Sequence, residues 1–347
     1  MTGYSAGRYI RLGIRGARNI ILRRPLSVSF EITHSCSADC EHCNWGGRVE
    51  ETHLTPAEYG EISRQLKPVI AHLSGGEPML RTDICDIAAA IANPNGAPLL
   101  QMVSHGAKLS VKRYEELRKA GLDRFCISLD FPDERHDDWR HIPGLFQKLS
   151  SNLSEIAAFK RNDILVNCCI TGANALALPD IVRTANSWGV GVNFSAYTSL
   201  RTNDNQFLVN DTELAVGLKE SIKEVISLKK QGYKVLTSDR ILWRYYDFLV
   251  NRTTGKCQSG YRFLVVNPDG RYTPCAMVKE YFRSREQMVR EFSKENSCRE
   301  CFICTRADTE KSVRDLLVDN LGFFWKNKNN GKPKNLLIEK PEAVVEA

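Results

Sequence analysis

Between residues 26 and 230, six short runs rich in β-forming residues alternate with helical patterns, and this alternation restricts the fold more than any other feature. The runs occupy residues 26–33, 69–74, 99–104, 124–130, 164–171 and 190–196. A helix begins after Thr55, and further helical patterns occupy residues 83–92, 112–120, 145–161, 178–188 and 211–230. Strands that alternate with helices are typical of a parallel sheet. The six units predict an α/β fold, namely a partial (β/α)6 TIM-like barrel rather than a flat sheet.

The pattern changes after about residue 250. Strand-like runs at residues 262–266 and 271–274 flank Asn267-Pro-Asp-Gly270, a strong turn signal that predicts a β-hairpin with cysteines before and after it. We therefore expect four parts. They are a basic amphipathic helix (1–25), the barrel (26–235), a small Cys-rich domain of hairpin and helix (236–325), and a loose Lys/Asn-rich tail (326–347).

The N-terminal helix has two distinct faces. At about 100° per residue, one face carries Arg8, Arg11, Arg15 and Arg18, and the opposite face carries Tyr9, Ile10, Ile14, Ile20 and Ile21. This pattern predicts an ordinary amphipathic helix that lies across the bottom of the fold. The alternative is a surface helix whose arginines contact anionic lipid or an acidic partner.

Charge and hydropathy restrict the partners and the compartment. The formal net charge is +7, from 48 Lys and Arg against 41 Asp and Glu, which gives no reason to expect nucleic acid. There is no secretory signal and no apolar run of about 18 residues. We expect a cytoplasmic protein, peripheral at the inner membrane face if the arginine face binds lipid. In a reducing cytoplasm, clustered cysteines indicate metal or redox chemistry rather than disulfides.

Three of the twelve cysteines follow the first strand at close spacing. Cys36, Cys40 and Cys43 form a Cys-x3-Cys-x2-Cys pattern. Three thiolates on one short loop can hold three irons of a [4Fe–4S] cube and leave the fourth iron open. An open position can bind and activate a ligand. A zinc site that drafts His34 or His42 as its fourth ligand is the alternative, although the spacing disfavours it.

This cysteine pattern, with the aromatic His42 before its last member, resembles the radical S-adenosylmethionine (SAM) enzymes. The resemblance continues at Ser74-Gly-Gly-Glu-Pro78, which looks like the GGEP motif of that family, and it covers about residues 26–200. It implies a [4Fe–4S] cluster that binds SAM. It also implies SAM contacts at the ends of successive strands, from His42, Gly75, Gly76, Glu77, Pro78, Ser104, Ser128, Asp130, Asn167 and Asn174. At Ser104-His-Gly106 the chain departs from the usual Thr-Asn-Gly turn.

The resemblance implies a reaction as well. A flavodoxin- or ferredoxin-type reductant would supply one electron, and reductive cleavage of SAM would give methionine and a 5′-deoxyadenosyl radical. That radical abstracts a hydrogen atom from a substrate or adds to an unsaturated bond. The protein orients the reactants and excludes water. Gly75 and Gly76 would allow the backbone to approach bound SAM closely.

Five further cysteines surround the predicted hairpin. Cys257 precedes it, Cys275 follows it, and Cys298, Cys301 and Cys304 form a Cys-x2-Cys-x2-Cys run. This set resembles the SPASM/twitch extensions of radical SAM enzymes and implies one auxiliary [4Fe–4S] cluster. We expect Cys257, Cys275, Cys298 and Cys301 as its ligands and Cys304 as the extra thiol. A structural zinc site built from four of these cysteines is the alternative.

Two classes of function follow from these patterns. The first is a radical SAM oxidoreductase or transferase acting on an unknown substrate, which could be a peptide, a sugar or a lipid. The second is an iron–sulfur electron-transfer protein or a zinc-stabilised binding protein that does not cleave SAM. Peptide-modifying relatives frequently carry a leader-binding domain before the barrel, and we expect none ahead of Cys36. The lipid alternative rests on a loose resemblance to the adenosylhopane synthases.

Overall fold

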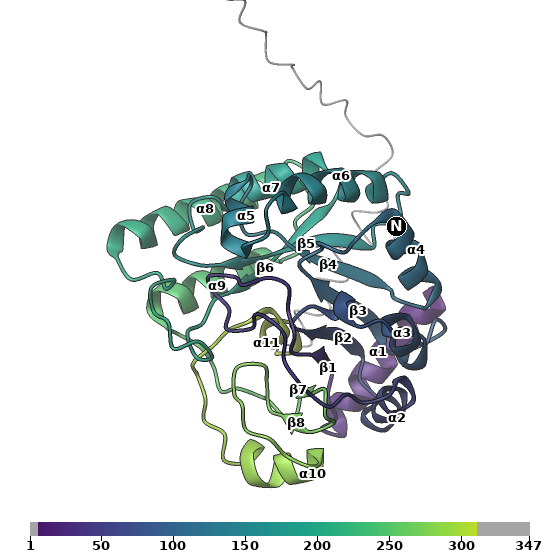
Figure 1. Ribbon diagram of the computed structural model, residues 1–347. Helices are drawn as coiled ribbons and strands as arrows, with labels where there is room; N and C mark the ends of the chain where they lie inside the picture. Colours follow the sequence, from purple (N-terminus) through teal and green to yellow (C-terminus); the bar gives the residue numbers. More distant parts are fainter. Residues whose placement is uncertain (1–5, 311–347) are drawn as a thin grey trace, which may run out of the picture. The chain divides into compact units, whose positions relative to one another are not determined.

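All six predicted strands are present in the computed structural model, which describes residues 6–310 (Figure 1). They are β1 (Ser27–Thr33), β2 (Ile70–Gly75), β3 (Leu99–Ser104), β4 (Arg124–Ser128), β5 (Ile164–Ile170) and β6 (Gly191–Ala196). Each is parallel to the next in chain order. The predicted α/β fold with a partial (β/α)6 barrel is therefore confirmed.

Helices cover the outer face of this curved sheet (Figure 1). They are α2 (Pro56–Leu66), α3 (Ile84–Ile91), α4 (Val111–Lys119), α6 (Leu145–Ala157), α7 (Leu178–Ser187) and α8 (Thr212–Lys230). Local sequence fixes where several of them begin. Thr55 and Glu58 form a capping box at the start of α2, and Ser110 and Asp211 accept backbone hydrogen bonds at the starts of α4 and α8.

The two faces of β1 differ in polarity, and this difference positions the site. Val28, Phe30 and Ile32 are fully buried in the hydrophobic core that the strands share with the outer helices. On the inner face, Ser29 hydrogen-bonds the side chain of Ser74 on β2 at 2.7 Å, and Glu31 follows it. The barrel therefore has an apolar outer layer and a polar interior.

The C-terminal part extends the sheet. Strand β7 (Phe263–Val266) pairs parallel with β1, and β8 (Tyr272–Thr273) pairs antiparallel with β7, which confirms the predicted hairpin. Around it lie α9 (Asp239–Asn251), α10 (Arg285–Met288), a π-helical turn (Val289–Ser293) and α11 (Cys304–Thr309). Helix α11 contacts both β6 and β7, so it lies across the opening that six strands leave in the barrel (Figure 1).

Helix α1 (Ala6–Ile21) lies within the predicted N-terminal helix. Arg8, on the predicted polar face, is only 4% exposed, and its guanidinium donates to both carboxylate oxygens of Asp123 at 2.6 Å. Ile10 and Ile14, on the apolar face, are 62% and 63% exposed. At these positions the helix therefore turns an arginine inward and two isoleucines outward. Contact between the remaining arginines and lipid stays a prediction.

Two more of the α1 arginines line a cavity at the surface. Arg15 and Arg18 border a space of about 610 Å³ together with Arg24, Arg64 and Lys67. The same cavity is lined by residues of α2 and α3, and Arg18, Arg64 and Lys67 are exposed at its rim.

Residues 6–310 belong to one compact unit. The predicted tail at 326–347 and the end of the predicted Cys-rich domain lie outside the described residues, and the four predicted domain bounds stay predictions. Within residues 6–310, no helix combines the length and the apolarity needed to cross a bilayer.

Candidate active site

The first three cysteines lie on a loop of residues 34–47, which we call the thiol loop. Its ends are joined because the Cys36 amide donates to the carbonyl of Gly47 at 2.9 Å. A turn places the Cys43 amide 2.9 Å from the carbonyl of Cys40. Helix α5 (Arg135–Arg140), which the sequence analysis did not predict, accepts hydrogen bonds from the loop amides through two of its carbonyls. The loop is therefore held from both sides by the backbone.

The turn after β2 supports the same loop. Gly76 donates to the carbonyl of Thr33 at 2.8 Å, and Glu77 donates to the carbonyl of Ser35 at 2.9 Å. A Cβ atom on Gly75, whose φ is +119°, would lie 2.1 Å from the Thr33 oxygen, and one on Gly76 would lie 2.2 Å from the Ser35 oxygen. Glycine is therefore needed at both positions because the backbone passes close to the chain at and just before the thiol loop. From the sequence, the same need is expected to come from bound SAM.

Glu77 is fully enclosed. Its carboxylate accepts hydrogen bonds from the Ser104 hydroxyl at 2.8 and 3.0 Å and from the backbone amide of Met79 at 3.0 Å. The His105 ring nitrogen Nε2 lies 3.1 Å from Glu77 Oε2 and 3.0 Å from the hydroxyl of Ser37 on the thiol loop. Pro78 begins a single 3-10 turn (Pro78–Leu80) that fixes this geometry. His105, at the point where the sequence departs from the family, thus connects Glu77 to the thiol loop.

Burial and two arginines determine the electrostatics of the three thiols. Burial raises the pKa of Cys36 to about 11, with smaller contributions from the charges of Glu77 and the other two thiols. Burial also raises the pKa of Cys40, although the Arg140 guanidinium acts against it. Arg140 Nη1 lies 3.3 Å from the Cys40 sulfur, and Arg201 Nη2 lies 3.0 Å from the Cys43 sulfur. Neither arginine is predicted from the sequence.

The end of β4 carries a buried ion pair. Asp130 is 0% exposed and accepts hydrogen bonds from Nε and Nη2 of Arg140 and from the Cys169 amide. Burial alone would raise the pKa of Asp130, but Arg140 and nearby histidines lower it overall. The predicted site residue Asn174 donates to the Asp130 carbonyl at 3.0 Å and to that of Cys169 at 2.9 Å. Asn174 therefore joins the ends of β4 and β5.

Two other predicted site residues lie side by side at this end of the sheet. Ser128 on β4 is in register with Asn167 on β5, and both are half-buried. Asn167 Oδ1 accepts a hydrogen bond at 2.9 Å from Asn193 on β6. The structure thus places Glu77, Ser104, Ser128, Asp130 and Asn174 at or just after the carboxyl ends of four successive strands, where barrel active sites are built. Asn167 lies in the middle of β5.

Buried polar atoms without a partner are concentrated at the thiol loop. His42 Nδ1, Trp45 Nε1, Trp139 Nε1 and Arg201 Nε make no hydrogen bond within residues 6–310. His42 stacks on Trp139 with ring centroids 5.3 Å apart, and burial lowers the pKa of His42 to about 4. An unpaired buried polar group costs roughly 1–3 kcal/mol, so several together indicate a further polar group at this place. The residues present therefore fit a cluster with inorganic sulfides and a polar ligand such as SAM.

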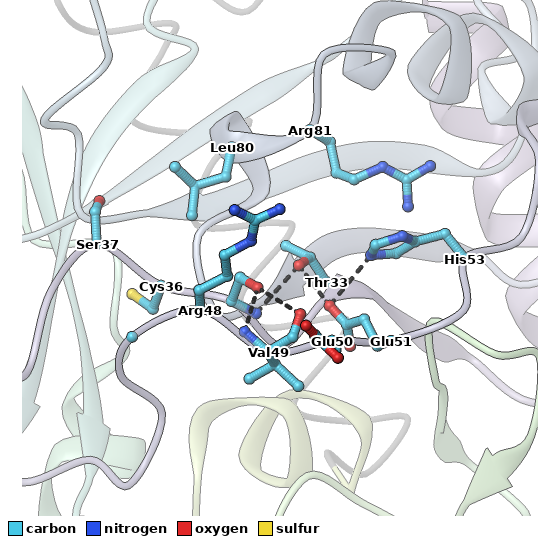
Figure 2. A pocket seen from close by; sticks show the side chains of 12 residues that line it. Thr33, Cys36, Ser37, Arg48, Val49, Glu50, Glu51, His53, Leu80 and Arg81 are labelled. Carbon is cyan, nitrogen blue, oxygen red and sulfur yellow. Dashed lines mark hydrogen bonds and ion pairs between the residues drawn. The ribbon is translucent and has the colours of Figure 1, made fainter.

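A cavity of about 670 Å³ opens beside the loop (Figure 2). Figure 2 shows Cys36 and Ser37 at one end and His53 and Arg81 at the other, with Arg48 between them. Its volume falls within the range of about 300–1,000 Å³ that is usual for small-molecule sites. The thiol of Cys36 thus has access to a space large enough for a small ligand.

Four of the five later cysteines form a second group. Burial raises the pKa of Cys275 to about 12, with the charges of Cys301 and Cys257 adding to it. Burial likewise raises the pKa of Cys301 to about 11, and Cys257 and Cys298 act in the same direction. The Cys257 amide donates to the carbonyl of Cys298 at 3.2 Å. The hairpin region thus brings Cys257, Cys275 and the pair Cys298 and Cys301 together from three separate parts of the chain.

Cys304 lies apart from this group. It begins α11, and its amide donates to the Ser195 hydroxyl on β6 at 3.1 Å. Burial raises the pKa of Cys126 on β4 to about 12, and the charge of Cys304 contributes to that shift and to the one at Cys169. Cys304 thus belongs to the barrel interior.

In the described part of the chain, no group of three or more His, Cys, Asp or Glu side chains is arranged to hold a metal ion. A [4Fe–4S] cube differs from a single ion because each of its thiolate ligands binds a different iron.

The comparisons with known proteins agree with this geometry. Residues 30–153 match the Radical SAM superfamily. The chain is 29% identical over 169 residues to an AdoMet-dependent heme synthase of Methanosarcina barkeri, which covers 46% of each chain. It is 26% identical over 275 residues to a PqqA peptide cyclase of Xanthomonas campestris, which covers 72% of this chain and 67% of the cyclase. The chain therefore spans about half the length of the first of these relatives.

Among solved structures, the fold is similar to that of SuiB from Streptococcus suis bound to S-adenosylmethionine. The TM-score is 0.60 at 15% identity, over 76% of this chain and 64% of SuiB. SuiB has also been solved bound to its precursor peptide SuiA. At this level of identity the likeness concerns the fold.

Proposed function

This chain carries a radical SAM superfamily domain, and from that premise we propose that it is an enzyme that cleaves S-adenosylmethionine reductively. The superfamily implies a [4Fe–4S] cluster and SAM as cofactors. The observation that carries the proposal is the backbone-held loop with Cys36, Cys40 and Cys43, around which unpaired polar atoms are buried. A cluster on these thiolates would supply the electron that splits SAM into methionine and a 5′-deoxyadenosyl radical.

Residues at the strand ends would orient SAM. We assign this role to His42, Gly75, Gly76, Glu77, Pro78, Ser104, Ser128, Asp130, Asn167 and Asn174. Since Glu77 is 0% exposed, contact between its carboxylate and the SAM amino group requires the His105 ring to move aside. Ser128 and Asn167 are half-buried, so their side chains are already accessible to a ligand.

The second cysteine group supports an auxiliary [4Fe–4S] cluster. Cys257, Cys275, Cys298 and Cys301 supply the four thiolates that such a cluster needs, and the charges of Cys257, Cys298 and Cys301 act on the pKa of another member of the group. We keep the sequence-based bounds for the two parts, with the barrel at 26–235 and the auxiliary domain at 236–325. The fifth thiol, Cys304, is assigned to the barrel because its amide binds Ser195.

We propose a peptide as the substrate class. The match to a peptide cyclase extends over 72% of this chain, well beyond the matched superfamily domain at residues 30–153. The polar barrel interior suits peptide amides, which need hydrogen-bond partners when they leave water.

The electron donor is proposed to be a flavodoxin- or ferredoxin-type protein, and the compartment a reducing cytoplasm. All twelve cysteines are free thiols, seven of them in the two groups proposed to bind iron.

The test is anaerobic. Protein reconstituted with iron and sulfide is mixed with SAM and dithionite, and 5′-deoxyadenosine is measured by chromatography. We expect its formation by the wild type and none by Cys36→Ala, while Cys85→Ala, which changes a cysteine outside both groups, stays active. A loaded protein with about four or more irons that forms no 5′-deoxyadenosine would refute the proposal.

The substrate class needs its own measurement. Short peptides encoded beside the gene are added to the same reaction, and mass spectrometry follows each peptide. A mass change that depends on SAM and on Cys36 supports a peptide substrate. Cleavage of SAM that is stimulated by a sugar or a lipid, and by no peptide, would contradict it.

A further inference from the structure

Arg201 is attached directly to the thiol loop. Its Nη2 lies 3.0 Å from the Cys43 sulfur, and its carbonyl accepts a hydrogen bond from the Asn44 side chain at 3.3 Å. Its guanidinium carbon lies 5.8 Å from the centroid of the Trp45 ring. The residue follows β6, so a distant part of the barrel places a positive charge against one of the three proposed cluster ligands.

The two arginines that contact thiols differ in their charge balance. Arg140 donates to Cys40 but is also paired with the buried carboxylate of Asp130, so this pair adds little net charge. No carboxylate forms an ion pair with Arg201 within residues 6–310, and its Nε is buried without a hydrogen-bond partner. Lys279 Nζ, 4.5 Å from the centroid of the Trp45 ring, places a second positive charge in the same region. The Cys43 side of the loop therefore carries uncompensated positive charge.

Charge and hydrogen bonds at the ligand sulfurs are among the factors that set the reduction potential of an iron–sulfur cluster. Reduction transfers one electron from a low-potential donor to the cluster and moves no proton, so it adds one negative charge. A nearby cation that is not neutralised stabilises the reduced form. A hydrogen bond to the thiolate acts in the same direction because it withdraws electron density from the sulfur.

We propose that Arg201 raises the reduction potential of the SAM-binding cluster by acting on Cys43, which makes the cluster easier to reduce. This inference rests on the proposed function, because it requires a cluster on Cys36, Cys40 and Cys43. Arg140 also donates to its thiol, but Asp130 neutralises its charge, so we assign Arg140 the smaller effect on the potential. The sequence contains no local signal for this role, because Arg201 and Cys43 are 158 positions apart.

The test is a potentiometric titration of the reconstituted full-length protein, followed by electron paramagnetic resonance. The signal of the SAM-binding cluster is identified by its change when SAM is added. For Arg201→Gln we expect about a tenfold lower ratio of reduced to oxidised cluster at a fixed potential, which is 59 mV for one electron. Arg201→Lys keeps the charge and should retain most of the wild-type potential.

Arg183→Gln is the matched control, because Arg183 is a half-exposed arginine on α7 that pairs with Asp180 and Glu224. The titration reads only the loaded fraction of protein, so a variant that binds less iron still yields a midpoint. A midpoint of Arg201→Gln equal to that of Arg183→Gln would overturn the proposal. Absence of any SAM-dependent signal in the wild type would instead count against the proposed function.

Discussion

Arg140 bridges Asp130 and the thiol loop: its Nε donates to Asp130 Oδ2 at 2.9 Å and its Nη1 lies 3.3 Å from the sulfur of Cys40. The carboxylate is fully buried, and its second oxygen accepts the Cys169 amide. Helix α5, which carries Arg140, is thereby tied both to the strand end and to the thiol loop. This contact links the folding of the barrel to the geometry of the proposed cluster site.

Loss of the Asp130 carboxylate should destabilise the fold strongly. In Asp130→Ala the guanidinium of Arg140 stays buried without its partner, which typically costs about 3–5 kcal/mol. Urea unfolding of the metal-free protein measures this loss. Asp133→Ala is the control, because Asp133 pairs with Arg135 at the surface and such pairs contribute about 0–1 kcal/mol. Equal losses of unfolding free energy in the two variants would show that the buried pair of Asp130 and Arg140 stabilises the fold no more than a surface pair does.

The turn after β2 should not tolerate a methyl group. In Gly76→Ala the new Cβ would lie 2.2 Å from the Ser35 oxygen, and overpacking of this kind costs about 1–3 kcal/mol. We expect lower stability together with reduced iron content after reconstitution. Gly13→Ala serves as the comparison, because nothing lies within 4 Å of its Cβ position in α1 and alanine favours a helix by about 1 kcal/mol. Full iron loading of Gly76→Ala would show that the thiol loop does not depend on this turn.

The neutral ring of His72 should make stability depend on pH. Burial, helped by the charge of Arg124, lowers the pKa of His72 to about 4, and its ring hydrogen-bonds Ser27 at 2.9 Å and Gln101 at 2.8 Å. Since the folded pKa lies below the unfolded value of about 6.5, this contribution is fully present above pH 6.5 and declines as the pH falls toward 4. The free energy of unfolding, measured from pH 7 to pH 4, should fall less steeply in His72→Gln. Parallel profiles for the two proteins would exclude this contribution.

Removal of Cys304 should spare the auxiliary metal. In a background with Cys36, Cys40 and Cys43 changed to alanine, the remaining iron reports on the second cysteine group alone. We expect Cys304→Ala to keep about four irons per chain and Cys301→Ala to lose most of them. Iron and sulfide analysis after reconstitution measures both. The opposite result would place Cys304 among the ligands and Cys301 outside them.

Local patterns were sufficient for the strands and for the clustered cysteines. Alternating apolar residues such as Val28, Phe30 and Ile32 predict β1 because each second side chain meets the outer helices. The thiol loop follows directly from the spacing of its cysteines. These signals lie within a few residues of one another, so sequence alone reveals them.

Contacts between distant parts of the chain were not predictable in this way. Arg140 and Cys40 are 100 positions apart, and the charged stretch that forms α5 has no apolar periodicity. In α1 the helical pattern separates two faces but does not say which one is turned inward. The arginines of a surface helix usually face solvent, but Arg8 is buried. Its guanidinium pairs with the carboxylate of Asp123 and donates to a backbone carbonyl, and these contacts replace apolar packing.

The position of helix α11 determines how iron at the later cysteines would act on the barrel. Helix α11 begins three residues after Cys301 and contacts both β6 and β7. The proposed iron ligand Cys301 and the helix that closes the barrel are therefore close neighbours in the chain. With iron at the second group, this segment is anchored at both ends. Without iron it keeps the contacts of α11 with the strands and the hydrogen bonds from Arg306 to the carbonyls of Cys301 and Gly255. The proposed auxiliary cluster would thus add a second anchor beside the helix that closes the barrel, so loss of iron should loosen the segment at Cys301 without releasing α11.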